Sequence, residues 1–442
     1  MSIGKDEIVR TGRAQPMKYG LLGENLTHSY SKIIHEKLGR YPYELFPVPP
    51  EQLAGFLQER DFAGLNVTIP YKTKVAEFCD IVDAEAERIG AINTLYFKEG
   101  VLHGANTDYH GLSYAAKRAG ISFTGKKVLL LGAGGTSRTA QALILDSGAA
   151  TLIVATRNPR PTEDFYDIGL AGEPTSGTHI TSVSYPQLPY DAEIIVNTTP
   201  VGTYPNNLGS LIHLADFPKC VGVLDVIYNP FSTVLVMEAG LLGIPCSGGL
   251  PMLVAQATRS AELFTGRTDL QGETEQIIRE LEFELRNIVL TGMPGSGKSV
   301  FGKKLAKKLN KSFVDLDIEV TKLAGKSIPE IFNDDGEPAF RALEAQVAME
   351  FGKRNNQVLA TGGGILLNPQ NTLALKQNGF MVFIDRPIPA LPTAGRPLSK
   401  SQTALAEMET IRRPLYEKYQ DAMVLNQGPF IKVFSELVAL FK

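Results

Sequence analysis

Residues 292–299 read GMPGSGKS and fit the pattern G-x-x-x-x-G-K-[ST]. Glycines at these positions let the backbone wrap closely around phosphate groups, so that successive N–H groups point inward. Lys298 can reach the β- and γ-phosphates of a nucleotide, and the Ser299 hydroxyl can bind Mg²⁺. The segment, the P-loop, therefore predicts a site for a nucleoside triphosphate.

The residues on either side supply the context that this motif needs. A short apolar run at 287–291 predicts a buried strand. After the loop, Phe301, Leu305 and Leu309 recur at four-residue spacing among lysines, which predicts an amphipathic helix. Because such a loop normally follows the first strand of its fold, a new domain is expected to begin near Arg286.

A second glycine-rich turn, GAGGTSR at 132–138, follows a strongly apolar strand predicted at 127–131. It is similar to a dinucleotide-binding turn, with Ser137 in place of the third glycine. Serine is small, so close packing of helix on strand can survive. One turn of this kind is weak evidence, and a role without a nucleotide stays open on this feature alone.

The next predicted strand, 151–155, ends in Thr-Arg-Asn-Pro-Arg, with Arg157 and Arg160 and no acidic residue. Enzymes that bind NAD usually place an acid here to hold the ribose hydroxyls. Guanidinium groups pair instead with phosphate in a forked geometry. The pair therefore favours NADP(H), through its 2′-phosphate, over NAD(H).

Several polar groups beyond residue 299 fit phosphoryl transfer. A strand predicted at 313–317 has Asp315 and Asp317 on one face, where they suit Mg²⁺ and a substrate hydroxyl, although a solvated edge would look similar. A strand at 358–361 runs into three glycines, where backbone can approach a ligand. Residues 386–396, rich in proline and glycine, resemble a mobile lid, and a helix is predicted to begin at 412–416.

Composition narrows the class of protein. The chain has 442 residues, enough for two or three domains, and 44 Lys plus Arg against 47 Asp plus Glu give a net charge of −3. This balance argues against nucleic acid or a membrane surface as a partner. Three cysteines without CxxC spacing indicate a reducing, cytoplasmic location, and no apolar run approaches the length of a membrane span.

Strands and helices alternate along the chain, so the α/β class is expected. Residues 1–17 are polar and are predicted to form a loose arm. Strands are expected at 18–23, 43–48, 64–69, 90–97 and 101–111, and later at 194–196, 221–226 and 380–385. A charged helix at 273–285 is expected to lead into the strand before the P-loop.

Six ordered signatures in the first 265 or so residues resemble those of shikimate dehydrogenases: HSYS (28–31), NVTIPYK (66–72), GAINT (90–94), GANTD (104–108), GAGGTSR (132–138) and GLPMLVAQA (249–257). The last 157 residues resemble shikimate kinases through GMPGSGKS, FVDLD, the Phe340-Arg341 pair, TGGG, a GRP lid and RRPLY. The composite resembles a bifunctional fusion of the two enzymes.

This resemblance implies a division into domains. An α/β substrate-binding domain is expected at 18–116, completed by helices at 250–266, and a Rossmann-type NADP domain at 117–249. A helical connector would span 267–285, and a P-loop kinase domain of α/β/α layers would span 286–442.

For the dehydrogenase part, the resemblance implies that Lys72 and Asp108 form the catalytic pair. A carbonyl that accepts hydride develops negative charge on oxygen and needs a proton, and an ammonium group supplies both field and proton. The other implied substrate contacts are Ser29, Ser31, Thr68, Asn93, Tyr228 and Gln256. The implied cofactor contacts are Gly132, Ala133, Gly134, Gly135, Thr136, Arg157, Arg160, Thr198 and Gly249. His28 and His35 are expected to be structural.

For the kinase part, the resemblance assigns Asp317 to a substrate hydroxyl, Arg341 and Arg412 to its carboxylate, and Gly363 and Gly364 to backbone contacts. Asp315 and Ser299 would hold Mg²⁺. Lys298 and the lid residue Arg396 would supply positive charge to the transferring phosphoryl group. The implied ATP contacts are Gly295, Ser296, Gly297, Lys298, Ser299 and Val300.

Two positions depart from the family pattern. Lys32 follows Ser31 where the dehydrogenases usually have proline, and the kinase lid is short and rich in proline. Two other functions remain open at this point. One is a single active enzyme with a degenerate binding or regulatory module, and the other is a quinate/shikimate dehydrogenase that uses NAD, fused to the kinase.

Overall fold

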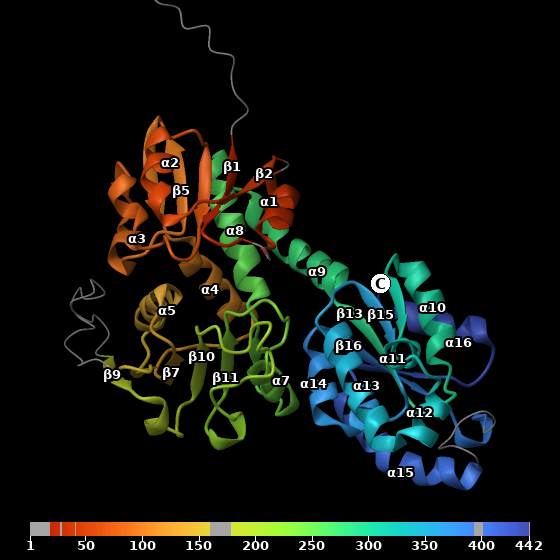
Figure 1. Cartoon of the computed structure of the whole chain (residues 1–442). Coiled ribbons are helices and arrows are strands. Elements are labelled where there is room, and N and C mark those ends of the chain that lie inside the picture. Colours follow the sequence, from red (N-terminus) through yellow and green to blue (C-terminus); the bar gives the residue numbers. More distant parts are fainter. Residues whose placement is uncertain (1–17, 27–28, 40, 160–177, 393–400, 442) are drawn as a thin grey trace, which may run out of the picture. The chain divides into compact units, whose positions relative to one another are not determined.

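The computed structural model describes residues 18–26, 29–39, 41–159, 178–392 and 401–441 (Figure 1). Strands alternate with helices over most of the described chain, which confirms the α/β class. The chain separates into two compact units. The first holds the described residues of Met1–Lys117, Ser122–Ser184 and Pro251–Ile277, and the second those of Arg118–Ile121, Tyr185–Leu250 and Ile278–Lys442.

The first unit begins with a mixed six-stranded sheet. Its strands are β1 (Tyr19–Gly23), β2 (Tyr43–Pro47), β3 (Gly64–Val67), β4 (Ile81–Val82), β5 (Thr94–Lys98) and β6 (Val101–Ala105), in the order β2-β1-β3-β5-β6-β4. β1 pairs in parallel with β2 and β3, whereas β5 is antiparallel to both of its neighbours. The helices that accompany this sheet include α1 (Ser31–Gly39), α2 (Leu53–Glu59), α3 (Ala84–Ile89), α4 (Thr107–Arg118) and α8 (Leu250–Thr265).

Helix α4 lies closely against α8. A Cβ atom added at Gly111 of α4 would lie 2.5 Å from the carbonyl oxygen of Met252 and 2.9 Å from Cβ of Gln256. Because contacts this short exclude any side chain, glycine is what lets the two helices approach. This contact brings Gln256 next to the start of α4.

Two groups of parallel strands follow, one in each unit. In the first unit β7 (Lys127–Leu131), β8 (Thr151–Ala155) and β9 (His179–Val183) pair in parallel, with α5 (Gly135–Asp146) after β7. In the second unit β10 (Ile194–Asn197), β11 (Gly222–Asp225) and β12 (Cys246–Ser247) do the same, with α7 (Val234–Leu241) after β11. Strands β7, β8, β10 and β11 are largely apolar and buried, which is typical of parallel sheets covered on both faces.

The second unit ends in a five-stranded parallel sheet. Its strands are β13 (Asn287–Thr291), β14 (Ser312–Asp315), β15 (Gln357–Ala360), β16 (Gly379–Asp385) and β17 (Ala422–Leu425), in the order β14-β15-β13-β16-β17. The helices are α9 (Thr274–Leu285), α10 (Lys298–Leu309), α11 (Leu316–Ala324), α12 (Ile328–Asp334), α13 (Gly336–Gly352), α14 (Pro369–Gln377), α15 (Gln402–Tyr419) and α16 (Phe430–Ala439).

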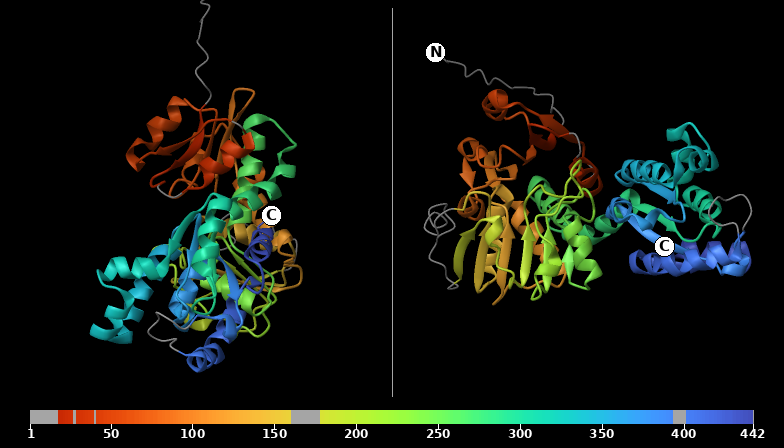
Figure 2. Two further views of the ribbon diagram at one scale, coloured as in Figure 1. Left: turned by 90° about the vertical axis from the view of Figure 1, so that its right-hand side faces the viewer. Right: turned by 60° about the horizontal axis from the view of Figure 1, so that its bottom comes forward.

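Alternation along β13 separates two apolar cores in this part. Val289 belongs to a core shared with α13 to α15, whereas Ile288 and Leu290 belong to a core shared with α10 and α16. Successive strand side chains point to opposite faces, so a strand buried on both sides contributes to both cores. Helices α10 and α16 accordingly cover one face of the sheet, and α13 and α14 cover the other (Figures 1 and 2).

Lys311, between α10 and β14, attaches the end of α9 to this sheet. Its Nζ donates to the carbonyl oxygens of Phe283, Glu284 and Arg286 at 2.6, 3.3 and 3.0 Å, and to Oδ1 of Asn356 at 3.1 Å. The last carbonyls of a helix lack partners within it, and a cationic donor satisfies them well. The C-terminal turn of α9 is therefore held by a residue of the P-loop part.

Three expectations about secondary structure were wrong. The strand expected at 101–111 ends at Ala105, and Asp108 lies in the first turn of α4. The strand expected at 313–317 ends at Asp315, because its carboxylate accepts a hydrogen bond from the backbone N–H of Asp317 and caps α11. Arg412 lies in the middle of α15 rather than at the start of a closing helix.

Two smaller points concern the whole described chain. Cys79, Cys220 and Cys246 form no disulfide. Among the described residues, none of the helices is long and apolar enough to cross a bilayer.

Candidate active sites

Lys72 and Asp108 form a close pair in the first unit. Nζ of Lys72 donates to Oδ2 of Asp108 at 2.5 Å, and the two side chains are 17% and 9% exposed. Lys72 follows β3, and Asp108 lies in the first turn of α4, where the helix dipole favours a carboxylate. The pair therefore holds the Lys72 amine beyond the carboxyl end of β3, next to the start of α4.

Asn93 and Gln256 surround this pair. Nδ2 of Asn93 donates to Oδ1 of Asp108 at 2.9 Å and lies 3.4 Å from Oε1 of Gln256. Its Oδ1 accepts from the backbone N–H of Thr107 at 2.7 Å, and the Lys72 carbonyl accepts from the N–H of Ile92 at 2.7 Å. Four predicted site residues, namely Lys72, Asn93, Asp108 and Gln256, therefore lie together.

A triangle of buried hydroxyls lies under these residues. Oγ1 of Thr94, Oγ1 of Thr107 and Oγ of Ser260 are 2.9–3.1 Å apart. Asn66 donates to Ser260 at 2.8 Å and accepts from the Tyr43 hydroxyl at 2.8 Å, which extends the network towards β2. Buried polar groups of this kind fix a unique arrangement when all of them are satisfied.

Ser29 and Ser31 lie where α1 begins. The backbone N–H of Ser31 donates to Oγ of Ser29 at 3.2 Å, and Ser31 is buried. Lys32 occupies the first turn of α1 and lies 3.9 Å from Glu36, so lysine in place of proline leaves the helix start intact. Thr68 follows β3, and its N–H donates to the carbonyl of Leu22 at 2.9 Å.

His35 is buried behind this site. Its ring stacks on Tyr43 with a centroid distance of 4.2 Å and an interplanar angle of 3°, and Nδ1 lies 2.8 Å from the Tyr41 hydroxyl. Burial lowers the pKa of His35 to about 3, so the imidazole is neutral near pH 7. The expectation of a structural role agrees with this packing, and His28 lies outside the described residues.

The turn after β7 has the features of a dinucleotide site. Gly132 has φ of +104°, and Cβ atoms added at Gly134 or Gly135 would meet no atom within 4 Å. Open space over a glycine turn at the start of α5 suits a pyrophosphate bound by helix N–H groups. Ser137 is fully buried and donates to the carbonyl of Gly132 at 2.8 Å, so it tightens the turn where the family motif has glycine.

The remaining predicted cofactor contacts divide between the units. Ala133, Thr136 and Arg157 lie in the first unit, and Arg157 is exposed just after β8. Arg160 lies outside the described residues. The predicted cofactor contacts Thr198 and Gly249 lie in the second unit, as does the predicted substrate contact Tyr228, so their place at the dehydrogenase site stays a prediction.

The P-loop connects β13 to α10 as predicted. Lys298 is buried, and its Nζ donates to the carbonyls of Gly292 and Met293 at 2.9 Å each. Gly295 and Gly297 have φ of +82° and +104°, a conformation that favours glycine. Ser296 Oγ is buried without a hydrogen-bond partner among the described residues, as expected for a group that a phosphate would satisfy.

Ser299 and Asp315 could hold a magnesium ion. Oγ of Ser299 donates to Oδ2 of Asp315 at 2.5 Å, so a hydroxyl and a carboxylate meet beside the P-loop. The described residues contain no group of three or more His, Cys, Asp or Glu side chains arranged to bind a metal. Mg²⁺ often takes only one or two protein ligands and completes its shell with water and substrate phosphates, so this pair fits it.

A pocket of about 710 Å³ adjoins the P-loop. The predicted residues that line it are Gly295, Gly297, Lys298, Ser299, Val300, Asp317, Arg341, Gly363, Gly364 and Arg412. Asp317 is half-buried at the start of α11. Arg396 lies outside the described residues, so its role on the lid is not described by the structure.

The three glycines after β15 each lie against a different wall of this pocket. A Cβ atom added at Gly362 would lie 2.7 Å from Oδ1 of Asp317, and one at Gly364 would lie 2.7 Å from Nη1 of Arg341. A Cβ atom at Gly363 would lie 2.7 Å from Cδ of Pro294. Close approach of backbone to neighbouring groups explains why these positions hold glycine.

Arg341 is oriented by two carboxylates of its own helix. Nη1 donates to Oε2 of Glu344 at 2.8 Å, and Nη2 donates to Oε1 of Glu337 at 2.9 Å. Burial raises the pKa of Glu344, and the Arg341 guanidinium beside it opposes this rise. Oε1 of Glu344 is buried and has no hydrogen-bond partner among the described residues.

Three residues at this site were missed from the sequence. Glu344 lines the pocket, Arg386 donates to the carbonyl of Gly295 at 3.1 Å, and Asn426 donates to the carbonyl of Ser296 at 2.7 Å. Arg386 and Asn426 directly follow β16 and β17. The carboxyl ends of parallel strands are where such sheets bind ligands, so their positions after strands were a usable signal.

Known families match both parts of the chain. Residues 294–441 match the sequence model of shikimate kinase, and residues 21–95 match that of the shikimate dehydrogenase substrate binding domain. Over 275 residues the chain is 33% identical to a shikimate dehydrogenase (NADP(+)) of Clostridium perfringens, strain SM101 / Type A. That match covers 60% of this chain and 98% of the relative.

Solved structures are similar over the same part. The shikimate 5-dehydrogenase of Thermus thermophilus, in complex with NADP(H) and shikimate, is 31% identical with a TM-score of 0.51, covering 60% of this chain and 99% of that one. The quinate dehydrogenase of Corynebacterium glutamicum, in complex with NAD, is 25% identical with a TM-score of 0.52, at 60% and 99% coverage.

The Rossmann-type fold and these matches define the class, since the chain belongs to the shikimate dehydrogenase family. A shikimate kinase domain follows in the same polypeptide, so the chain is a bifunctional fusion of the two enzymes and acts in the shikimate pathway.

Proposed function

We propose that the chain reduces 3-dehydroshikimate to shikimate with NADPH and then phosphorylates the 3-hydroxyl of shikimate with ATP and Mg²⁺. The observation that carries this proposal is the Lys72–Asp108 pair within a buried polar network, in one chain with a P-loop pocket that includes Asp317, Arg341 and Arg412. The hydroxyl made by the first reaction would be the nucleophile of the second.

In the reduction, NADPH would supply a hydride to the carbonyl carbon of the substrate. The Lys72 ammonium would give its proton to the carbonyl oxygen, and Asp108 would hold the amine in place. Asn93 and Gln256 would hydrogen-bond the ring hydroxyls, and Ser29 and Ser31 would bind the carboxylate.

In the phosphorylation, Asp317 would orient the attacking hydroxyl, and Arg341 and Arg412 would bind the substrate carboxylate. Lys298 would neutralise charge on the transferring phosphoryl group, and Ser299 and Asp315 would hold Mg²⁺, which would supply further positive charge. The domain boundaries predicted from the sequence, with the NADP domain at 117–249 and the kinase from 286, belong to the same proposal.

NADPH is favoured over NADH because Arg157 follows β8 and because the relative from Clostridium perfringens is an NADP(+) enzyme. The structure of a related quinate dehydrogenase contains NAD, so the activities of this chain with NADPH and with NADH should be compared. The ratio of kcat/KM for the two cofactors should favour NADPH. Arg157→Ala should weaken the binding of NADPH and leave the binding of NADH unchanged. A preference for NADH in the wild type would contradict the proposal.

The decisive experiment is a coupled assay on the full chain with 3-dehydroshikimate, NADPH, ATP and Mg²⁺. Nicotinamide absorbance should fall while mass spectrometry shows shikimate 3-phosphate. Lys72→Ala should abolish reduction but leave phosphorylation of added shikimate, and Lys298→Ala should do the reverse. Lys74→Ala and Lys303→Ala, at exposed neighbouring lysines, are the matched controls. Shikimate that accumulates without phosphorylation would mean a silent kinase part.

A further inference from the structure

The middle glycine after β15 is held from two sides. On one side, its backbone packs against Pro294 of the P-loop, where an added Cβ would lie 2.7 and 2.8 Å from Cδ and Cγ. On the other side, the carbonyl oxygen of Gly363 accepts a short hydrogen bond from the hydroxyl of Tyr416. Gly363 thus lies between the nucleotide-binding loop and helix α15.

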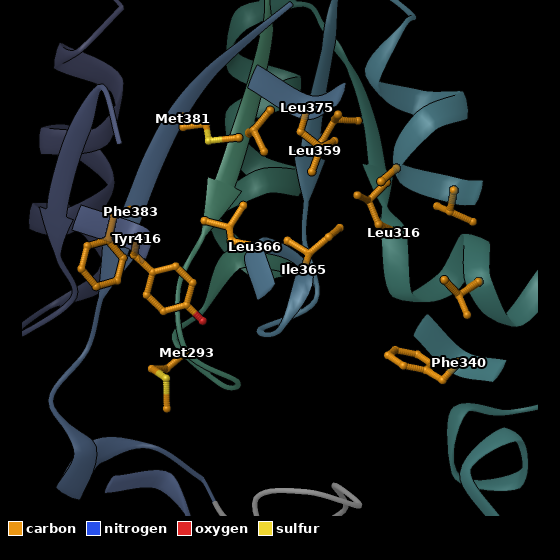
Figure 3. Close-up of a cluster of buried hydrophobic side chains, with 14 of the residues drawn as sticks. Met293, Leu316, Phe340, Leu359, Ile365, Leu366, Leu375, Met381, Phe383 and Tyr416 are labelled. Atoms are coloured by element: carbon orange, nitrogen blue, oxygen red, sulfur yellow. The ribbon is translucent and has the colours of Figure 1, made fainter. Parts of the chain in front are cut away.

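Tyr416 itself has little freedom to move. The residue is 1% exposed, and its ring lies 5.0 Å from the Phe383 ring at an interplanar angle of 31°. Figure 3 shows both rings among the apolar side chains of this core, with the Tyr416 hydroxyl pointing away from Phe383. Interiors are close-packed, so a ring in such a core delivers its polar end to a defined place.

The hydrogen bond also orients the peptide that follows. The C=O and N–H groups of a trans peptide are coplanar and point in opposite directions. Fixing the Gly363 carbonyl towards Tyr416 therefore fixes the direction of the N–H of Gly364, a residue that lines the pocket beside Arg341. Arg412, which also lines the pocket, lies four residues before Tyr416 on the same helix, about one turn away.

We propose that Tyr416 is a positioning residue for the phosphoryl-acceptor half of the kinase site. Its hydroxyl sets the Gly363–Gly364 peptide relative to Arg341 and Arg412, so it controls binding of the hydroxylated carboxylic acid that accepts the phosphoryl group. The nucleotide is held by 295–300, to which Tyr416 makes no hydrogen bond among the described contacts. This inference rests on the proposed kinase function.

The test is Tyr416→Phe in the full chain, which removes one oxygen and keeps the ring. KM for shikimate should rise about tenfold or more, the scale of a lost buried hydrogen bond, while KM for ATP changes less than about twofold. Binding of a fluorescent ADP analogue with Mg²⁺ should also be retained. Tyr419→Phe is the matched control, because Tyr419 is also a tyrosine and lies nearly one helical turn further along α15. It should leave both KM values unchanged.

Each other outcome overturns the proposal. Unchanged KM for shikimate would show that the hydroxyl does not position the acceptor loop. Equal losses of shikimate and nucleotide affinity, or lost ADP binding while reduction of 3-dehydroshikimate persists, would show a structural role only. A wild type that phosphorylates no shikimate would instead refute the kinase proposal itself.

Discussion

Asp108 accepts a hydrogen bond from Lys72 through one carboxylate oxygen and from Asn93 through the other, at 2.5 and 2.9 Å. The carboxylate therefore joins Lys72, in the segment that follows β3, to the residue before β5 and to the start of α4. A Lys–Asp pair on the surface has few such constraints. This pair is oriented before any substrate arrives, which is what proton transfer to a developing alkoxide requires.

Asp108→Asn should reduce the rate of 3-dehydroshikimate reduction by about a hundredfold or more, because it removes the charge that holds the Lys72 ammonium. Steady-state kinetics with NADPH would measure the loss, and phosphorylation of shikimate should be unchanged. Asp61→Asn is the matched control, since Asp61 pairs with Lys18 at the same 2.5 Å but is 60% exposed. Equal effects of the two variants would contradict a specific role for Asp108.

Ser260→Ala should lower kcat/KM for 3-dehydroshikimate by about tenfold, because it removes one hydrogen-bond partner from each of the buried hydroxyls of Thr94 and Thr107, and both of these hydroxyls also bond Asn93. Thr265→Ala, at the exposed end of the same helix, removes a bond to the Ala261 carbonyl and one from the exposed backbone N–H of Arg267, and it should have little effect. A Ser260→Ala enzyme with wild-type kcat/KM would show that the triangle is not coupled to the site.

Acidification should destabilise the first unit through His35. The pKa of this imidazole is about 3 when folded and about 6.5 when unfolded, so the unfolded chain binds more protons between these values. The stability is present above about pH 6.5 and is lost as pH falls below it, by at most about 1.4 kcal/mol per pH unit.

The melting temperature of the dehydrogenase part, measured as the temperature at which its activity is lost, should therefore decrease as the pH is lowered from 6.5 to 5. His35→Phe should flatten this dependence. His213→Gln, at a side chain 78% exposed, should leave the slope as in the wild type. Parallel slopes in the wild type and His35→Phe would rule His35 out as the source.

Gly362→Ala should abolish most phosphorylation of shikimate, because the new Cβ would lie 2.7 Å from Asp317 Oδ1 and 3.0 Å from Glu344 Oε1. Backbone or carboxylate must then shift at the acceptor side of the pocket. Binding of Mg²⁺–ADP and reduction of 3-dehydroshikimate should persist and serve as internal controls. Full phosphorylation activity in this variant would place the acceptor elsewhere.

Gly134→Ala should raise KM for NADPH without unfolding the protein. Gly134 has φ of −84° and ψ of −169°, which alanine adopts readily, and its Cβ would meet no protein atom within 4 Å. The methyl group would instead occupy space proposed for the pyrophosphate. Gly240→Ala in α7, which also faces open space, is the control and should leave KM unchanged.

Local pattern predicted most elements of this fold. The P-loop, its strand and its helix were correct because apolar periodicity and glycine spacing act over a few residues. Asp317 was placed on a strand wrongly because alternation in FVDLD hid a capping interaction, in which Asp315 ends the strand and starts a helix. A short polar side chain that bonds its own backbone competes with the strand pattern.

The site was predicted less completely than the fold. Lys72, Asn93, Asp108 and Gln256 were expected together only through family signatures, and they do meet. The hydroxyl triangle was not foreseen, since Thr94 and Ser260 are 166 positions apart and packing of α8 alone brings them together. Glu344 looked like any helix carboxylate until tertiary packing buried it.

The Lys311 bonds to Phe283, Glu284 and Arg286 bear on how the kinase part can be produced alone. A fragment that begins at residue 286 would leave the buried Lys311 ammonium group without its acceptors at Phe283 and Glu284, and it should express poorly or aggregate. One that begins at Thr274 keeps the whole helix. Limited proteolysis of the intact chain should accordingly release a fragment whose first residue precedes α9, rather than one that starts at the strand before the P-loop.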